Sequence, residues 1–127
     1  MKVQPVFNGK IHVTAVKNEK WSWYDYETSA KDDEKILEVA KDICPYKYTL
    51  DRQHLSKEAG DRLRSVVENA IGEKLDIPED PIYSTTYSPS YNFAKDKNSY
   101  SILLFCQQNL GKDGEVRHDR TAVDIYI

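Results

Sequence analysis

Residues 121–127, TAVDIYI, alternate between apolar and polar side chains. In an extended chain this alternation places Val123, Ile125 and Ile127 on one face, because successive side chains of a strand point to opposite sides. We therefore predict that the sequence ends in a strand that packs on the core through these three residues.

The segments upstream of this strand have the composition of further strands. YSILLFCQQN (100–109) is apolar on both faces, which is typical of a central strand, and IYSTTY (82–87) is rich in strand-forming residues. LGKDGE (110–115) is predicted to be a turn, and the polar aromatic stretch SPSYNFAKDKN (88–98) would lie between the two strands. The C-terminal part of the chain therefore predicts three strands.

A first helix is predicted to begin after Ser29, whose side chain can cap the helix, with Asp32 in its first turn. Pro45 would end this helix, because proline lacks the N–H that the next helical bond needs. Its core stripe would consist of Ile36, Ala40 and Ile43, flanked by Leu37 and Cys44.

A second helix is predicted after Ser56, which is its expected N-cap. It would end at Gly72 or in the segment 76–78. Its apolar side chains recur at helical spacing and form one continuous face, which consists of Ala59, Leu63, Val66, Val67, Ala70 and Ile71.

The N-terminal part predicts a three-stranded meander. Asn8-Gly9 lies between two β-rich runs and favours a type I′ turn with both residues at positive φ. Pro5 has no N–H for a ladder, so the first strand would lie at a sheet edge or at a bulge. KNEK (17–20) permits a second turn, which leads into the alternating stretch WSWYDYE (21–27).

Together these patterns predict the α+β class, with an antiparallel sheet of about six strands in the order βββ-αα-βββ and two helices packed on one face. The 127 residues fit a single domain, 1–127. The net charge of -3, without a basic stripe, argues against nucleic-acid binding. Since no apolar run is long enough to cross a membrane or to form a signal peptide, we expect a soluble cytoplasmic protein.

No motif in the sequence predicts catalysis, a metal site or a cofactor. His118 and Asp119 would point to opposite faces of a strand, so they cannot act as an acid–base dyad unless a bulge intervenes. The three histidines fall in separate predicted elements without metal-ligand spacing, and no glycine-rich phosphate-binding motif is present. Cys44 and Cys106 are isolated, which favours buried, reduced thiols.

The remaining candidates are residue types that suit binding. Guanidinium groups hold phosphate oxygens, aromatic faces stack on a base, and amides bind a base edge or a ribose hydroxyl. An alternative is that the helical arginines flank the buried Leu63 and that the tyrosines cover the core. The candidate residues are Arg62, Arg64, Arg117 and Arg120, the aromatic stretch YSPSYNF (87–93), and Asn92 and Asn98.

In size, in its mixture of sheet and helices and in the order of these groups, the chain resembles the phage Thoeris anti-defence proteins of the first type. These are small sponges that sequester cyclic ADP-ribose isomers made by bacterial TIR-domain enzymes. The resemblance implies a non-enzymatic protein that works in the host cytoplasm as a homodimer or larger assembly, with pockets built by more than one subunit. It implies a ligand site that consists of Arg64, Tyr91 or Phe93, Asn92 or Asn98, Arg117 and Arg120.

The strand phase constrains how the two C-terminal arginines can share a site. Counting back from Val123 places Arg117 on the core-facing side of the strand and Arg120 on the opposite side. Both can serve one pocket only if a bulge near Asp119 re-aims one of them, or if a second subunit contributes its own copy.

A second function from a different class fits the same composition. A small inhibitor that covers a partner such as a host defence protein, as anti-CRISPR and toxin-immunity proteins do, would also carry many exposed tyrosines. We expect self-association in either case, because the surface is rich in tyrosine and Pro5 indicates a strand near a sheet edge.

Overall fold

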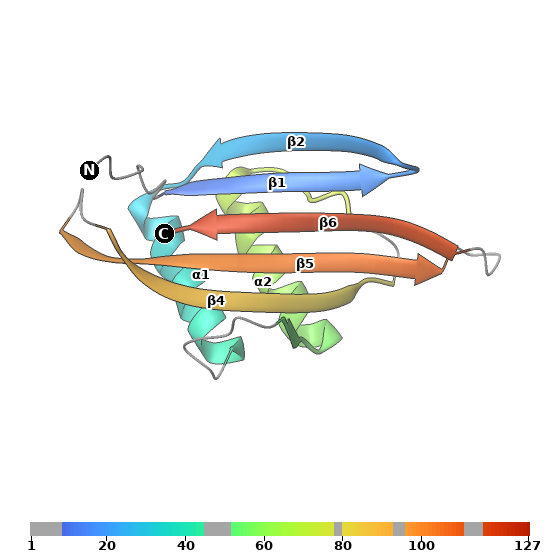
Figure 1. The fold of residues 1–127 in the computed structure, drawn as a ribbon. Coiled ribbons are helices and arrows are strands. Elements are labelled where there is room, and N and C mark those ends of the chain that lie inside the picture. The colour runs from blue at the N-terminus through green and yellow to red at the C-terminus, as the bar shows by residue number, and fades with distance from the viewer. Residues whose placement is uncertain (1–8, 45–51, 78–79, 93–95, 111–115) are drawn as a thin grey trace.

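A computed structural model, which describes residues 9–44, 52–77, 80–92, 96–110 and 116–127, contains one six-stranded antiparallel sheet and two helices (Figure 1). The order of strands across the sheet is β2-β1-β6-β5-β4-β3. The predicted α+β class and antiparallel sheet are therefore confirmed. The elements are β1 (Lys10–Lys17), β2 (Lys20–Glu27), α1 (Ala30–Ile43), β3 (Gln53–His54), α2 (Lys57–Ile71), β4 (Ile82–Asn92), β5 (Lys97–Leu110) and β6 (Val116–Tyr126).

The predicted order βββ-αα-βββ matches the described elements only roughly. The short strand β3 lies between the helices and was not predicted, since two residues carry no periodic pattern. The first predicted strand and Asn8 lie outside the described residues, and of the predicted Asn8-Gly9 turn only Gly9 is described, with a positive φ of 73°. The stretch 88–98 is not a separate linker, because β4 and β5 extend into it and pair as far as Asn92 and Lys97. Backbone pairing continues there without the apolar alternation that marks a core-facing strand.

The turn predicted within residues 17–20 is confirmed. Asn18 and Glu19 have φ angles of 49° and 65°, which are the two left-handed positions of a type I′ loop. The loop pairs Lys17 with Lys20 and fixes the register of the whole β1–β2 hairpin.

Both helices begin and end where the sequence predicts. The hydroxyls of Ser29 and Ser56 accept hydrogen bonds from the backbone N–H groups of Asp32 and Ala59, each at 3.1 Å. α2 ends at Gly72, whose φ of 74° is a left-handed conformation that glycine adopts without steric cost.

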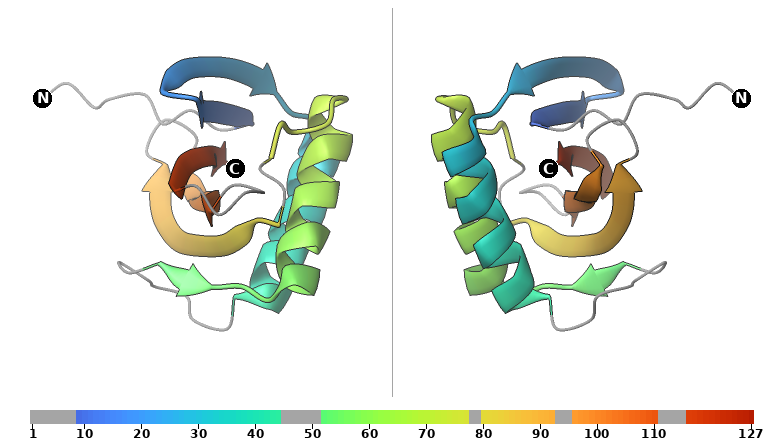
Figure 2. Two further views of the ribbon diagram at one scale, coloured as in Figure 1. Left: turned by 90° about the vertical axis from the view of Figure 1, so that its right-hand side faces the viewer. Right: turned by 90° about the vertical axis from the view of Figure 1, so that its left-hand side faces the viewer.

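The sheet curves around the two helices, which lie on one side of it (Figure 2). Val123 and Ile125 are fully buried, which confirms the predicted phase of β6, and Ile127 is half-buried. Residues of both helices join the same buried cluster as these strand residues. On α1 the buried side chains include Val39, which the sequence analysis missed, whereas Ile43 is only partly buried.

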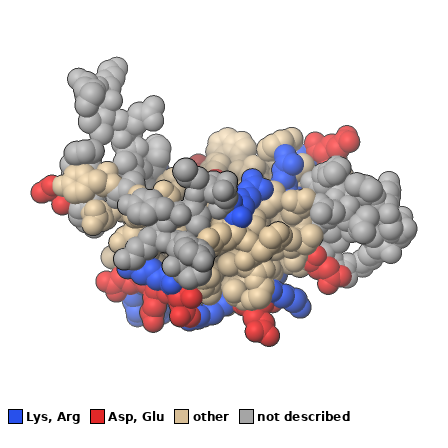
Figure 3. All heavy atoms as spheres, turned by 60° about the horizontal axis from the view of Figure 1, so that its bottom comes forward, with Lys and Arg blue, Asp and Glu red and all other residues tan. Residues whose placement is uncertain are grey.

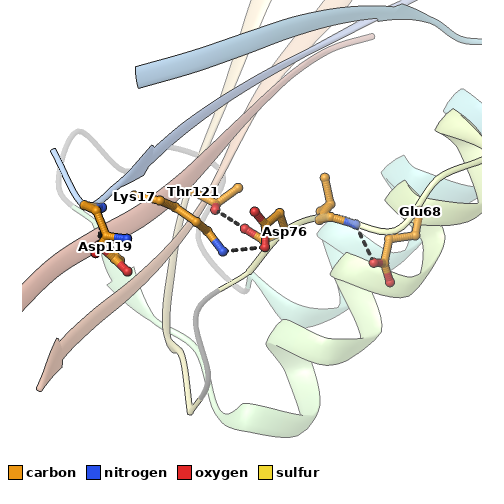
Figure 4. Close-up of polar contacts among 7 residues, drawn as sticks. Lys17, Glu68, Asp76, Asp119 and Thr121 are labelled. Carbon is orange, nitrogen blue, oxygen red and sulfur yellow. Dashed lines mark hydrogen bonds and ion pairs between the residues drawn. The ribbon is translucent and has the colours of Figure 1, made fainter. Parts of the chain in front are cut away.

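The segment that follows α2 is tied to the sheet by polar contacts (Figure 4). Lys17 of β1 forms an ion pair with Asp76, and the hydroxyl of Thr121 on β6 donates to the Asp76 carbonyl oxygen at 2.8 Å. The carboxylate of Glu68 accepts from the backbone N–H of Leu75 at 2.7 Å. These contacts hold the chain across one end of the curved sheet.

Replacing Gly60 by alanine tests the close packing of α2 on β4. An added Cβ would lie 2.2 Å from ring atoms of Tyr83, which is almost fully buried and cannot move aside easily. We expect Gly60→Ala to lower the free energy of unfolding by about 1–3 kcal/mol in denaturant titrations, although alanine favours a helix intrinsically. Ser65→Ala, at an exposed position of the same helix, should cost nothing. Equal stability of both variants would contradict this packing.

Candidate functional site

The sheet face turned away from the helices carries the polar and aromatic side chains that alternate with the core residues. We call it the outer face. On β1 the positions of this face are His12, Thr14 and the buried Val16, which alternate with the core residues Ile11 and Val13. Cross-strand pairing extends these positions into rows across neighbouring strands, so residues distant in sequence become neighbours on the outer face.

One end of the outer face combines exposed rings with guanidinium groups. Trp21 and Trp23 are 66% and 65% exposed. The guanidinium carbon of Arg120 lies 5.3 Å from the ring centroid of Trp21, and that of Arg52 lies 4.0 Å from the ring centroid of Phe105. Both are cation–π contacts. These five residues are called the cationic end below.

The arginines of the cationic end differ from those on α2. Arg62 and Arg64 form ion pairs with carboxylates, whereas Arg52 and Arg120 have no carboxylate partner among the described residues. Phe105 pairs with Ala122 across the β5–β6 ladder, so Arg120 is its diagonal neighbour, roughly 7–8 Å away between Cα atoms. Two guanidinium groups without a carboxylate partner among the described residues therefore lie on the same face of the sheet, one over the Trp21 ring of β2 and the other over the Phe105 ring of β5.

The other end of the outer face is acidic around a histidine. Nδ1 of His12 lies 2.6 Å from a carboxylate oxygen of Asp25, and Nε2 lies 3.2 Å from the hydroxyl of Thr14. Asp124 pairs with His12 from the other side. Burial raises the pKa of Asp124, and His12 partly offsets this increase. We call His12, Asp25 and Asp124 the acidic end.

Thr14, His12 and Asp25 follow the order of nucleophile, base and carboxylate in hydrolases. The side chains of His12 and Asp25 are 35% and 55% exposed, so water screens this chain of contacts instead of being excluded from it. A pairing of His12 with Asp25 could have been predicted from the sequence, because a two-residue loop at Asn18-Glu19 sets that register.

A cleft of about 570 Å³ lies on the opposite side of the sheet, between β2 and the segment after α2. Its floor includes Val13, Leu75 and Thr121, and its rim includes Tyr26 and Glu73. The Tyr26 hydroxyl donates to Glu73 at 2.9 Å, and the pKa of Tyr26 is raised by burial and by this carboxylate. The cleft is lined by three acidic residues, Asp25, Glu73 and Asp76, and one basic residue, Lys74, so the end of the outer face with Arg52 and Arg120 suits phosphate better.

The structure separates the site residues that the sequence suggests. Tyr91 and Asn98 face each other at the end of the β4–β5 hairpin, where the Tyr91 hydroxyl donates to Asp96. Arg120 pairs with Gln107, and β5 from Asn98 to Gln107 spans roughly 30 Å at the rise of an extended strand. One chain therefore does not bring Arg120 together with Tyr91 and Asn98.

Arg64 lies on α2, away from Tyr91 and Asn98 and also away from Arg120. Its buried Nε is 3.5 Å from a carboxylate oxygen of Glu68, an ion pair too long for a strong hydrogen bond. The side chains of Asn92 and Arg117 and the whole of Phe93 lie outside the described part of the chain. Their roles stay predictions.

The β5–β6 ladder has an irregular register near the position where the sequence analysis required a bulge. From Gln108 to Leu110 it advances by two residues on β5, and from Asp119 to Val116 by three on β6. Such an extra residue re-aims side chains. A bulge is one of the two features that would let Arg117 and Arg120 share a pocket, and the backbone has this extra residue. The direction of the Arg117 side chain stays a prediction.

Charges of both signs are interspersed on the face drawn in Figure 3. Within the described ranges, no group of three or more His, Cys, Asp and Glu side chains could hold a metal ion. No helix in the described part of the chain is long and apolar enough to span a membrane.

Comparisons with known proteins add nothing to this geometry. No protein-family model, curated protein or solved structure matches the chain.

Asp124→Asn tests the electrostatics of the acidic end. Because burial raises the folded-state pKa of Asp124 above its unfolded value, the folded state loses stability as pH rises from the unfolded to the folded pKa. The amide avoids this penalty, so we expect the variant to be more stable than the parent at pH 7. The difference should disappear below pH about 3.9 in denaturant titrations. The control Glu38→Gln, at an exposed helix position, should show no such gain, and a destabilised Asp124→Asn at pH 7 would contradict the expectation.

Proposed function

We propose that this protein is a non-enzymatic binding protein that sequesters a phosphorylated nucleotide, of the cyclic ADP-ribose isomer class, on its outer face. The observation that supports the proposal is the cationic end, where Arg52 and Arg120 each lie over an aromatic ring and have no carboxylate partner among the described side chains. Guanidinium groups without a carboxylate partner among the described residues, together with the exposed rings of Trp21 and Trp23, are what a ligand with phosphates and a base requires.

Each part of such a ligand has a matching group on the outer face. The guanidinium forks of Arg52 and Arg120 can donate hydrogen bonds to phosphate oxygens in bidentate geometry, since a ring below a guanidinium leaves its N–H edges exposed. The exposed rings of Trp21 and Trp23 offer stacking surfaces for a base. Asp25, at the acidic end, can accept hydrogen bonds from ribose hydroxyls.

The other site residues expected from the sequence would reach the ligand from a second subunit. Tyr91 and Asn98 lie too far along β5 from Arg120 to share a ligand within one chain. A neighbouring copy could bring its hairpin end, and with it Asn92 and Phe93, to the cationic end of the first. Arg117 would contribute only if the bulge turns it toward the outer face.

Calorimetric titration of cyclic ADP-ribose isomers into single variants tests the proposal. A charge-assisted contact to phosphate is worth about 1.5–3 kcal/mol, so Arg120→Ala and Arg52→Ala should each weaken binding by roughly ten- to a hundredfold. The matched control is Arg62→Ala, which removes an arginine that is paired with Asp42 on the helical side. Its affinity should equal that of the parent, and circular dichroism checks that all variants fold. No binding by the parent, or equal affinity in all three variants, would refute the proposal.

The exposed tryptophans also favour a second candidate, inhibition of a partner protein. Tryptophan, tyrosine and arginine dominate the energetics of protein interfaces, and Trp21, Trp23 and Arg120 form such a cluster. The two candidates differ in what the purified protein carries. A sponge should release a nucleotide on heating, detectable by mass spectrometry, whereas a protein inhibitor should release none.

A further inference from the structure

The cleft on the inner side of the sheet lies beneath β1 and β2, away from the main contact between helix and sheet. α2 packs chiefly on β4 and β5, whereas the segment after α2 forms the other wall of the cleft. Across β2, β1 and β6, one row of the sheet consists of Ser22, Ala15 and Thr121, and all three side chains are small. A space of about 570 Å³ therefore stays open, within the roughly 300–1,000 Å³ that is typical of small-molecule sites.

Two polar contacts fasten the segment after α2 to the sheet and leave one oxygen of each carboxylate available. The Tyr26 hydroxyl donates to Oε2 of Glu73 at 2.9 Å, and Lys17 pairs with Oδ1 of Asp76 (Figure 4). Among the described residues, no contact occupies Oε1 of Glu73 or Oδ2 of Asp76. Glu73 and Asp76 are three residues apart, at most roughly 11 Å between Cα atoms, so one ligand can reach both.

The charges beside the cleft offset each other. Asp76 is paired with Lys17, and Lys74, which also lines the cleft, follows Glu73 directly in the sequence. Asp25 lines the cleft as well, but its carboxylate is bonded to a histidine on the outer face. The described lining therefore favours a neutral ligand over a phosphate or an ammonium group, since a charged ligand would lose its hydration without a counter-charge.

The carboxylates determine what the neutral ligand must offer. An ionised carboxylate accepts hydrogen bonds and cannot donate them, so the ligand has to bring O–H or N–H donors to Glu73 and Asp76. The hydroxyl of Ser22 can donate or accept beside them.

The remaining walls of the cleft are aromatic and aliphatic. Tyr24 and Tyr26 stand side by side on the inner side of β2, and Tyr24 is 60% exposed although it lies on this side. Val13 and Leu75 form an apolar floor. A saturated ring with C–H groups on its faces and hydroxyls around its edge fits both features, because its faces can pack on a tyrosine ring while its hydroxyls donate to the carboxylates.

We propose that the cleft between β2 and the segment after α2 is a second binding site, which takes a neutral sugar. The ring of the sugar packs against Tyr24, and its hydroxyls donate to the available oxygens of Glu73 and Asp76. The site lies on the inner side of the sheet, so it is separate from the nucleotide site of the proposed function on the outer face and does not depend on it.

A glycan array probed with the labelled protein provides the first test. The parent should bind glycans whose terminal sugar is neutral. Glycans that end in sialic acid should bind at least roughly tenfold more weakly, because the carboxylate of that sugar would meet the carboxylates of Glu73 and Asp76.

Two variants of β2 place the sugar in the cleft. Ser22→Leu fills the space from an exposed position, so it should fold and should weaken glycan binding at least roughly tenfold. The matched control is Ser88→Leu, the same change at an exposed position of β4, which should bind as the parent does. Tyr24→Ala enlarges the cleft instead of filling it and should weaken binding about tenfold, because the ring face is lost. Circular dichroism checks that the variants fold.

The proposal is overturned if the parent binds no neutral glycan, if it prefers sialylated ends, or if folded Ser22→Leu and Tyr24→Ala bind as the parent does. Loss of glycan binding in Arg120→Ala would move the sugar to the outer face and would also overturn it. Since Ser22→Leu should leave the calorimetric affinity for cyclic ADP-ribose isomers unchanged, failure of one proposal is distinguishable from failure of the other.

Discussion

The pairing of β1 with β6 is the contact on which both faces of the sheet depend. It joins the start of the described chain to its end and places Val13 opposite Val123 and Ile11 opposite Ile125. These pairs build the core on the inner side. Because side chains alternate, the same register must place His12 beside Asp124 and Val16 beside Arg120 on the outer side. A slip of one residue would exchange the core and the outer face, so the buried pairs fix the candidate site as firmly as they fix the fold.

The curvature of the sheet explains why the two sides differ in chemistry. The helices and the segment after α2 occupy the inner side (Figure 2), where Lys17, Asp76 and Thr121 meet in polar contacts that tie this segment to the sheet. Lys17 and Asp76 form an ion pair there. On the outer face the arginines rest on rings instead, and a guanidinium held in this way keeps its donors for a ligand. The arrangement suits the binding of an anion better than the conversion of a substrate.

The strand β2 forms both the free edge of the sheet and part of the outer face. The odd-numbered residues of β2 direct their side chains to the outer face and their backbone groups to the edge, because a type I′ loop sets both properties together. Trp21 therefore lies on the outer face with its ring and at the free edge of β2 with its backbone groups.

Local sequence determined the helices, their caps, the phase of β6 and the β1–β2 turn, because Ser29, Ser56 and Gly72 act within one helical turn and the alternation in residues 121–127 is a property of one strand. The local sequence of the two-residue turn at Asn18-Glu19 also determines the register that pairs His12 with Asp25. Tertiary structure alone decided that β1 pairs with β6, that Arg52 rests on Phe105 and that Asn98 lies far from Arg120. No local pattern encodes these contacts, because they depend on which strands become neighbours, and that choice is made by burial of the whole core.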